Sequence, residues 1–159
     1  MNVGEASFFS KGDIVFIGAQ EVPPSDYDNV NRGDQVLGHI ATVKRVINIK
    51  DRTVTSGNNS DINDTGSSPS INFETLGVSK GMMVKNTTTN NYAMVYSASS
   101  QEITTSSHKQ DPTGSNPTLP VFTAGQTYSI QSLVLEDDLE AVPQFGDHVE
   151  LVGFTDGTS

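Results

Sequence analysis

The chain of 159 residues contains no cysteine and no tryptophan. Without cysteine it forms no disulfide, no thiolate metal site and no thiol nucleophile. Apolar residues make up only 34% of the sequence, which is low for a globular domain. No apolar run approaches the roughly 20 residues of a transmembrane helix. The first residues lack both the basic and the apolar stretch of a signal peptide. We therefore expect neither a membrane span nor a secretory leader.

Positive charge is also scarce. Nine Lys and Arg residues stand against 19 Asp and Glu residues, so the net charge is −10. Proteins bind nucleic acids largely by neutralising phosphates with Lys and Arg, so we expect no nucleic-acid partner. The same charge disfavours adhesion to an anionic membrane. The length suits a single compact β domain over residues 1–159, or two small β subdomains over about residues 1–75 and 76–159.

Strand-forming residues recur along the chain, whereas helical periodicity is scarce. Residues 132–142 fit either a helix or a strand that leads into an acidic turn, and Asp51 and Arg52 fit a tight turn. Long polar loops are predicted at residues 21–33, 56–70 and 106–120. We predict an all-β fold with small β-barrel or β-sandwich elements. Its strands are expected at residues 13–18, 36–49, 53–55, 92–98, 102–105, 128–135 and 148–154.

One short phrase occurs twice, as S-K-G-D-I-V at residues 10–15 and as S-K-G-M-M-V at residues 79–84. Gly12 and Gly81 each precede an apolar strand, because a polar turn often needs a residue with positive φ. Each phrase is followed by an alanine–valine strand and then by a short threonine-rich strand. Gly125 and Gly146 stand before strands in a related way. The pattern predicts a repeated turn-and-strand unit, which arises either by internal duplication or by independent convergence.

No pattern in the sequence indicates a chemistry. No serine lies in a nucleophile elbow, and no glycine-rich phosphate loop is present. The three histidines have no metal-ligand spacing; they are His39, His108 and His148. Acidic residues at 136–138 and 140 fit a glycosidase-like pair or, more simply, a solvated turn. We therefore predict that the chain is not an enzyme and that it has no catalytic, cofactor-binding or metal-binding residues.

Two further motifs have simple local explanations. The tripeptide Arg32-Gly33-Asp34 matches an integrin-binding sequence, but it stands where a turn is expected. Residues 61–66 imitate the start of a calcium-binding loop, yet residue 72, at the twelfth position, is Asn where a glutamate is required. We interpret residues 61–66 as part of a hydrated loop.

The most informative stretch covers residues 78–130. It reads V-S-K-G-M-M-V-K-N-T-T-T-N-N-Y-A-M-V-Y-S-A-S-S-Q-E-I-T-T and, later, F-T-A-G-Q-T-Y-S-I. It resembles a pattern in structural proteins of tailed bacteriophages, in which K-G-D-x-V-x-N-T-T leads to A-x-V-x-x-V, a threonine-rich strand and F-x-x-G-D-x-Y-x-I. Met82 and Gln126 replace the two aspartates of that pattern, and Ala98 replaces a common valine. The resemblance covers about a third of the chain and carries no catalytic residue.

The resemblance implies a component of the virion, assembled in the host cytoplasm. It favours a capsid decoration (cement) protein that binds and stabilises the shell of the major capsid protein. The alternative is a neck, tail or fibre component, including a glycan- or receptor-binding module. Decoration proteins of this style further imply a homo-oligomer, with a trimer favoured.

The predicted interface residues are Phe8, Phe9 and Tyr27. Two adjacent phenylalanines in an N-terminal arm are costly to leave in water, so we expect them to contact a neighbouring subunit or, equally, to pack in the chain's own core. Tyr27 lies in the polar loop at residues 21–33, which we expect to contact neighbours together with the loop at residues 56–70.

Overall fold

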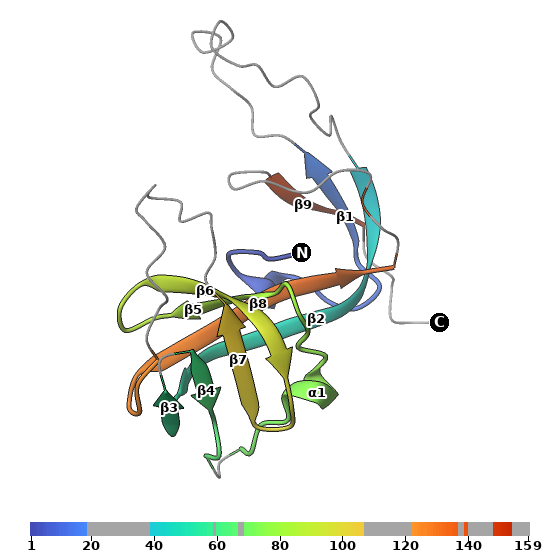
Figure 1. The fold of residues 1–159 in the computed structure, drawn as a ribbon. Helices are drawn as coiled ribbons and strands as arrows, with labels where there is room; N and C mark the ends of the chain where they lie inside the picture. Colours follow the sequence, from blue (N-terminus) through green and yellow to red (C-terminus); the bar gives the residue numbers. More distant parts are fainter. Residues whose placement is uncertain are drawn as a thin grey trace, which may run out of the picture. The chain divides into compact units, whose positions relative to one another are not determined.

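The computed structural model describes residues 1–18, 39–58, 60–66, 69–106, 122–136, 139 and 148–153. More than half of these residues lie in strands and very few lie in helices, which confirms the all-β prediction (Figure 1). The helices are a 3-10 turn, η1 (Ala6–Phe8), and one short α-helix, α1 (Phe73–Leu76). The strands are β1 (Ile14–Gly18), β2 (His39–Thr53), β3 (Ser56–Asn58), β4 (Asp61–Asn63), β5 (Met83–Asn86), β6 (Asn91–Ala98), β7 (Glu102–Ser106), β8 (Thr127–Leu135) and β9 (His148–Gly153).

The strands form one antiparallel sheet in the order β3-β4-β7-β6-β5-β8-β2-β1-β9. The sheet of described strands is not closed into a barrel, so the expectation of barrel elements was wrong. The reason is that β1 and β9 extend the sheet beyond β2, and the described strands form no pairing between β9 and β3. The sequence pattern predicts strands, but it does not show whether the two edge strands of the sheet pair with each other and so close a barrel.

Three local predictions were also wrong. Asp51 and Arg52 do not form a tight turn: β2 runs through them, with an irregularity at Asp51, whose φ is 47°. The stretch at residues 56–70 is not one loop, because β3 and β4 form a hairpin in it. Residues 132–135 continue β8 as a strand, so the helical alternative for this stretch was wrong. The predicted loop at residues 21–33 lies outside the described residues, and so does the predicted loop at residues 106–120 except for Ser106, which ends β7.

The chain is divided into two compact units that are not successive halves. Unit 1 comprises Met1, Phe8–Val46 and Leu133–Ser159, and unit 2 comprises Asn2–Ser7 and Ile47–Ser132. Strands β2 and β8 therefore each contribute residues to both units. Unit 2 contains most of the sheet and α1, and unit 1 contains β1 and β9.

The core of unit 2 is built by period-two alternation. Val84 on β5 and Val95 on β6 are fully buried, as are Ile62 and Ile103, which face each other across β4 and β7. Helix α1 adds Phe73, whose ring centroid lies 6.2 Å from that of Tyr128 on β8. The helix is short but well capped. At its start the Asn72 side chain accepts a hydrogen bond from the Thr75 N–H, and at its end Gly77 adopts a left-handed conformation.

The repeated S-K-G phrase folds into the same turn twice. Gly12 has φ 92° and donates its N–H to Val43 O, and Gly81 has φ 94° and donates its N–H to Val95 O. In return, Val43 N donates to Asp13 O, and Val95 N donates to Met82 O, both at 2.8 Å. Bonds from Asp13 N to Ser10 O and from Met82 N to Ser79 O close the two turns. Positive φ at the third residue together with this closing bond is typical of a type II turn.

A third turn of this kind precedes β8. Gly125 has φ 88°, and its N–H donates to Val54 O. Val54 N donates back to Gln126 O, and Gln126 N donates to Thr123 O. The predicted turn-and-strand unit thus occurs three times in the described residues, each time bonded to a valine: Val43 on β2, Val95 on β6 and Val54, which directly follows β2. Gly146 lies outside them.

The N-terminal arm belongs to the chain's own sheet. Asn2 forms an antiparallel bridge with Ser132, and Val3 N donates to Gln131 O. The Asn2 side chain accepts a hydrogen bond from Met83 N at 2.9 Å, and Ala6 is fully buried. Residues 1–6 are therefore docked on β8 and β5, which favours the alternative that the arm packs against its own chain.

Candidate functional site

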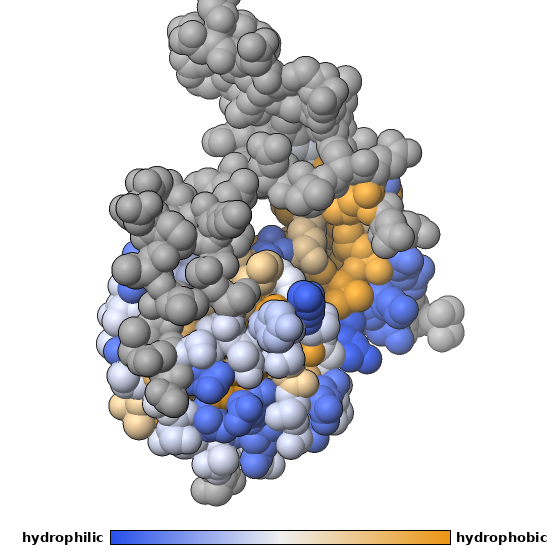
Figure 2. Space-filling view, in the orientation of Figure 1, coloured by the Kyte–Doolittle hydropathy of each residue, from blue (hydrophilic) through white to orange (hydrophobic). Residues whose placement is uncertain are grey.

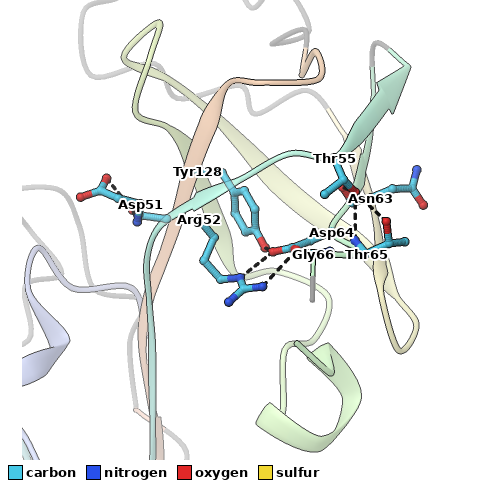
Figure 3. Close-up of polar contacts among 9 residues, drawn as sticks. Asp51, Arg52, Thr55, Asn63, Asp64, Thr65, Gly66 and Tyr128 are labelled. Carbon is cyan, nitrogen blue, oxygen red and sulfur yellow. Dashed lines mark hydrogen bonds and ion pairs between the residues drawn. The ribbon is translucent and has the colours of Figure 1, made fainter. Parts of the chain in front are cut away.

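The most polar buried cluster in the described residues joins Arg52, Asp64 and Tyr128 (Figure 3). Arg52 Nε lies 2.5 Å from Asp64 Oδ2, and Arg52 Nη2 donates to Asp64 Oδ1 at 3.0 Å. The Tyr128 hydroxyl donates to Asp64 Oδ2 at 2.7 Å. The Gly66 N–H also donates to Asp64 Oδ1. Asp64 thus accepts from four donors supplied by β2, β8 and the segment after β4.

The cluster has a marked effect on the acid–base properties of its members. Burial by itself raises the pKa of Asp64, but the hydrogen bonds from Arg52 and Tyr128 outweigh it and hold that pKa below its ordinary value. Burial, and then the hydrogen bond to the Asp64 carboxylate, raise the pKa of Tyr128. Both oxygens of the Asp64 carboxylate accept hydrogen bonds from the protein itself. We therefore interpret the cluster as a structural contact that holds the strands together.

Sequence reasoning missed this cluster. Arg52 was assigned to a turn, and Asp64 belongs to the stretch interpreted as a hydrated loop. The segment is instead held by an ion pair and by Thr55, whose hydroxyl oxygen accepts from Thr65 N at 2.9 Å (Figure 3). Asp61 and Asn63 lie on β4 rather than in an open loop. No local pattern could reveal the cluster, because its three members are brought together only by strand pairing.

The histidines and acidic residues do not assemble into a site in the described residues. His39 lies on β2 and His148 on β9, on opposite sides of β1. His108, the Arg32-Gly33-Asp34 tripeptide and most of the acidic stretch at residues 136–140 lie outside the described residues. Within the part of the chain that the structure describes, no three His, Asp or Glu residues are grouped so that they could hold a metal ion.

The predicted interface residues differ in their surroundings. Phe8, at the end of η1, is 76% exposed, whereas Phe9 is half-buried. Tyr27 lies outside the described residues. Phe8 is therefore available to a neighbouring molecule even though the arm that precedes it is docked.

A second exposed apolar surface lies on the three strands of unit 1. Alternation along β1 buries Val15 and Ile17 and turns Ile14 and Phe16 to the opposite face. Ile40, which lies opposite Phe16 on β2, is 66% exposed, and Val152 on β9 is 52% exposed. Figure 2 shows apolar surface gathered over these strands. We call Ile14, Phe16, Ile40 and Val152 the β1–β9 apolar surface.

Three of the four tyrosines lie in the described residues, and they differ in solvent exposure. Tyr128 is buried and bonded to Asp64, whereas Tyr92 and Tyr96 on β6 are exposed. Only the latter two can contact a ligand from solution among the described tyrosines.

Comparisons with models of protein families, with curated protein sequences and with solved structures found no match. Among the described residues, no helix has the length and apolar character needed to cross a bilayer.

Proposed function

We propose that the chain is a structural protein of a tailed-bacteriophage virion and acts as a capsid decoration (cement) protein. In this role it binds the shell of the major capsid protein and stabilises it, without catalysis and without a cofactor. The resemblance over residues 78–130 supports this proposal, because those residues include β5, β6, β7 and the first part of β8.

The observation that carries the proposal is the β1–β9 apolar surface. Val15 and Ala41 are buried on one face of this part of the sheet, while Ile14 and Ile40 are exposed on the other. A strand that is apolar on both faces is typical of a sheet that is covered on both sides. Burying one such side chain against a neighbour contributes on the order of 1.5–3 kcal/mol, and many copies on a particle multiply weak contacts into stable attachment.

Self-association follows from the same surface. Strand β9 ends the strand order, and an edge strand beside exposed apolar side chains favours pairing with another copy. We propose a homo-oligomer, with a trimer as the favoured state, and exposed Phe8 as a further contact residue. The net charge of −10 keeps free subunits soluble before assembly.

The test is to mix the purified protein with capsids assembled without it and to image the particles. Density at regular sites over the whole shell is the expected result. Density at a single vertex would instead assign a neck or tail role, and no added density would overturn the proposal.

A matched pair of variants tests the surface. Ile40→Ser removes an exposed apolar side chain from the β1–β9 apolar surface, whereas Leu76→Ser removes one that is 42% exposed on α1. We expect Ile40→Ser to weaken attachment and self-association, measured by co-sedimentation and by analytical ultracentrifugation. Leu76→Ser is expected to behave like the wild type. Equal binding by both variants would show that the β1–β9 apolar surface does not mediate attachment.

The second candidate function is a glycan- or receptor-binding module of a tail or fibre. The observation that favours it is the exposure of Tyr92 and Tyr96 on one strand, since exposed aromatic side chains are common in such sites. Strong and selective hits on a glycan array, lost in a Tyr96→Ala variant, would support this candidate over decoration.

A further inference from the structure

A ladder of three side-chain pairs runs along the outer face of the β5–β6 hairpin. Lys85 lies opposite Tyr92, and Met83 lies opposite Met94. The residues between them point to the core, where Val84 and Ala93 are fully buried. The third pair is Lys80 with Tyr96, at the other end of the hairpin. We call Lys80, Met83, Lys85, Tyr92, Met94 and Tyr96 the Lys–Tyr ladder.

Both lysines are held over aromatic rings. Lys85 Nζ lies 5.5 Å from the centroid of the Tyr92 ring, and Lys80 Nζ lies 5.0 Å from that of Tyr96. These distances are within the range of cation–π attraction. Lys85 is placed by the strand register. Lys80 belongs to the second S-K-G turn, which is bonded to β6 through Gly81 N and Val95 O, next to Tyr96.

Tyr96 is presented by an irregularity in the strand. The β6–β7 register shifts between Val95 and Ser97, so Tyr96 is an extra residue with no counterpart on β7. Bulges of this kind re-aim side chains and are common beside binding sites. As a result Tyr96 is 57% exposed although its strand is central in unit 2.

The charge of the ladder is opposite to that of the chain. The chain has net charge −10, yet neither Lys80 nor Lys85 forms an ion pair within the described residues. The register places the carboxylates of Asp61 on β4 and Glu102 on β7 on the same outer face, and neither pairs with these lysines. Two ammonium groups with no ion-pair partner among the described residues thus lie at the ends of a row formed by two exposed tyrosines and two half-buried methionines.

We propose that the Lys–Tyr ladder binds an acidic segment of a partner protein in an extended conformation. Tyr92 and Tyr96 are four residues apart on one strand, which corresponds to roughly 13 Å. Carboxylates at positions i and i+4 of an extended segment have the same spacing, and the side chain at i+2 then falls on Met83 and Met94. The ladder therefore fits an acid–apolar–acid pattern at alternate positions. This inference does not depend on the virion role.

The position of the ammonium groups favours a peptide over a stacked sugar. A pyranose ring binds an aromatic side chain by lying on its face, but here the rings of Tyr92 and Tyr96 each have a lysine ammonium over them. A carboxylate, in contrast, can accept hydrogen bonds from the ammonium without displacing it. Since the lysines are already held in place, less side-chain entropy is lost on binding.

The test measures binding of a fluorescent peptide with glutamates at i and i+4 and leucine at i+2, by anisotropy at low salt. We expect Lys80→Gln and Lys85→Gln each to weaken binding about fivefold, which is the upper range for an exposed ion pair. Tyr96→Ala is expected to weaken it about tenfold, as for an aromatic interface anchor. Lys44→Gln is the matched control, because Lys44 is exposed on β2 and the substitution changes the net charge equally.

Three outcomes would overturn the proposal. The first is wild-type affinity in a Lys80→Gln/Lys85→Gln double variant that melts at the wild-type temperature. The second is equal binding of a peptide whose two glutamates are adjacent, which would indicate charge attraction without the ladder geometry. The third is no binding of the peptide. In that case, lysine-dependent binding of polygalacturonate would assign the ladder to an anionic glycan, and no binding of polygalacturonate would leave it without an acidic ligand.

Discussion

The phenol hydroxyl of Tyr128 donates a hydrogen bond of 2.7 Å to Oδ2 of Asp64, and it thereby ties β8 to the segment that follows β4. The same oxygen faces Arg52 Nε from β2. Residues from β2, β8 and the segment after β4 thus meet at one carboxylate. The other ion pair among the described residues, Lys50 with Glu5, lies at the surface.

The first prediction concerns this hydroxyl. Tyr128→Phe keeps the ring in the core but removes the donor, so we expect the free energy of unfolding to fall by about 1–3 kcal/mol, as for the loss of a hydrogen bond to a charged group. Tyr92→Phe is the control, because Tyr92 is exposed, and it should stay within about 0.5 kcal/mol of the wild type. Urea unfolding followed by fluorescence gives both values. A Tyr128→Phe variant as stable as the wild type would contradict the role assigned to the contact.

The second prediction is a dependence of stability on pH. The pKa of Asp64 is lower in the folded chain than its unfolded value of about 3.9, so folding favours the ionised carboxylate. The resulting stability is fully present above the unfolded pKa and is lost as the pH falls through the folded pKa. We therefore expect the free energy of unfolding to decrease more steeply below about pH 4 in the wild type than in Asp64→Asn.

Glu5 titrates in the same range, because its hydrogen bond with Lys50 lowers its pKa to about 2. The comparison is therefore best made in a Glu5→Gln background, in which Asp64 is the remaining carboxyl with a lowered pKa among the described residues. Identical slopes with and without Asp64 would show that the ion pair does not respond to acid.

The third prediction concerns a close backbone approach at the edge strand β3. A Cβ added at Gly57 would overlap the carbonyl oxygen of Phe122, and it would lie 2.9 Å from the carbonyl carbon of Phe122 and 3.1 Å from Asp61 O. These are backbone atoms that cannot rotate away. Gly57→Ala should therefore destabilise the chain by about 2 kcal/mol or more, in the range of overpacked sites. Gly4→Ala, which meets nothing within 4 Å, is the control in thermal melts.

The fourth prediction concerns the repeated turns. At Gly81 and Gly125 a Cβ would meet no atom within 4 Å, so space does not oppose a side chain there. The values of φ, 94° and 88°, do oppose it. Each Gly→Ala change should therefore cost about 1–2 kcal/mol. Because the two turns have similar φ values, the two losses in the free energy of unfolding should agree. Unequal losses would show that the two turns differ in backbone strain.

The fifth prediction separates the arm from the exposed phenylalanine. Deleting residues 1–7 removes the pairing with β8, the Asn2 contact to Met83 and the buried Ala6, so we expect a loss of about 2–4 kcal/mol. Phe8→Ser should change stability by less than about 0.5 kcal/mol, because Phe8 is exposed. An arm deletion with an unchanged melting temperature would show that the arm is dispensable for the fold.

The sequence predicted the strands well where alternation is strong. The strands expected at residues 92–98 and 128–135 correspond to β6 and β8 with small shifts at their ends. The glycine turns were also predictable, because the requirement for positive φ is local. Each of these features depends on residues only a few positions apart.

The rest of the fold depends on distant partners, and here the sequence failed. Asp51 and Arg52 have the composition of a turn, but pairing with β8 keeps them in a strand, where Ser129 Oγ accepts the Asp51 N–H. Residues 61–66 were interpreted as part of a hydrated loop, but Asp64 within them is buried and paired with Arg52. The Lys–Tyr ladder could be read in part, because the alternation of Tyr92, Met94 and Tyr96 is visible. The position of Lys85 over its ring comes from the register of β5 on β6, and that of Lys80 comes from the turn bonded to Val95 through Gly81.

The docking of the N-terminal arm has a consequence for how the chain reaches its native state. Leu133 donates its N–H to the carbonyl oxygen of Met1, so this bond can form only after Leu133 has been synthesised. During synthesis the N-terminal arm has no partner on β8 until residues 131–133 have been made, although the strands from β1 to β7 have already been synthesised. Contacts of such long range are formed late and slow folding. Neither unit is a continuous stretch of the chain. A chain that stops before Gln131 keeps the pairing of β1 with β2, but it lacks the residues of β8 that pair with Asn2 and Val3.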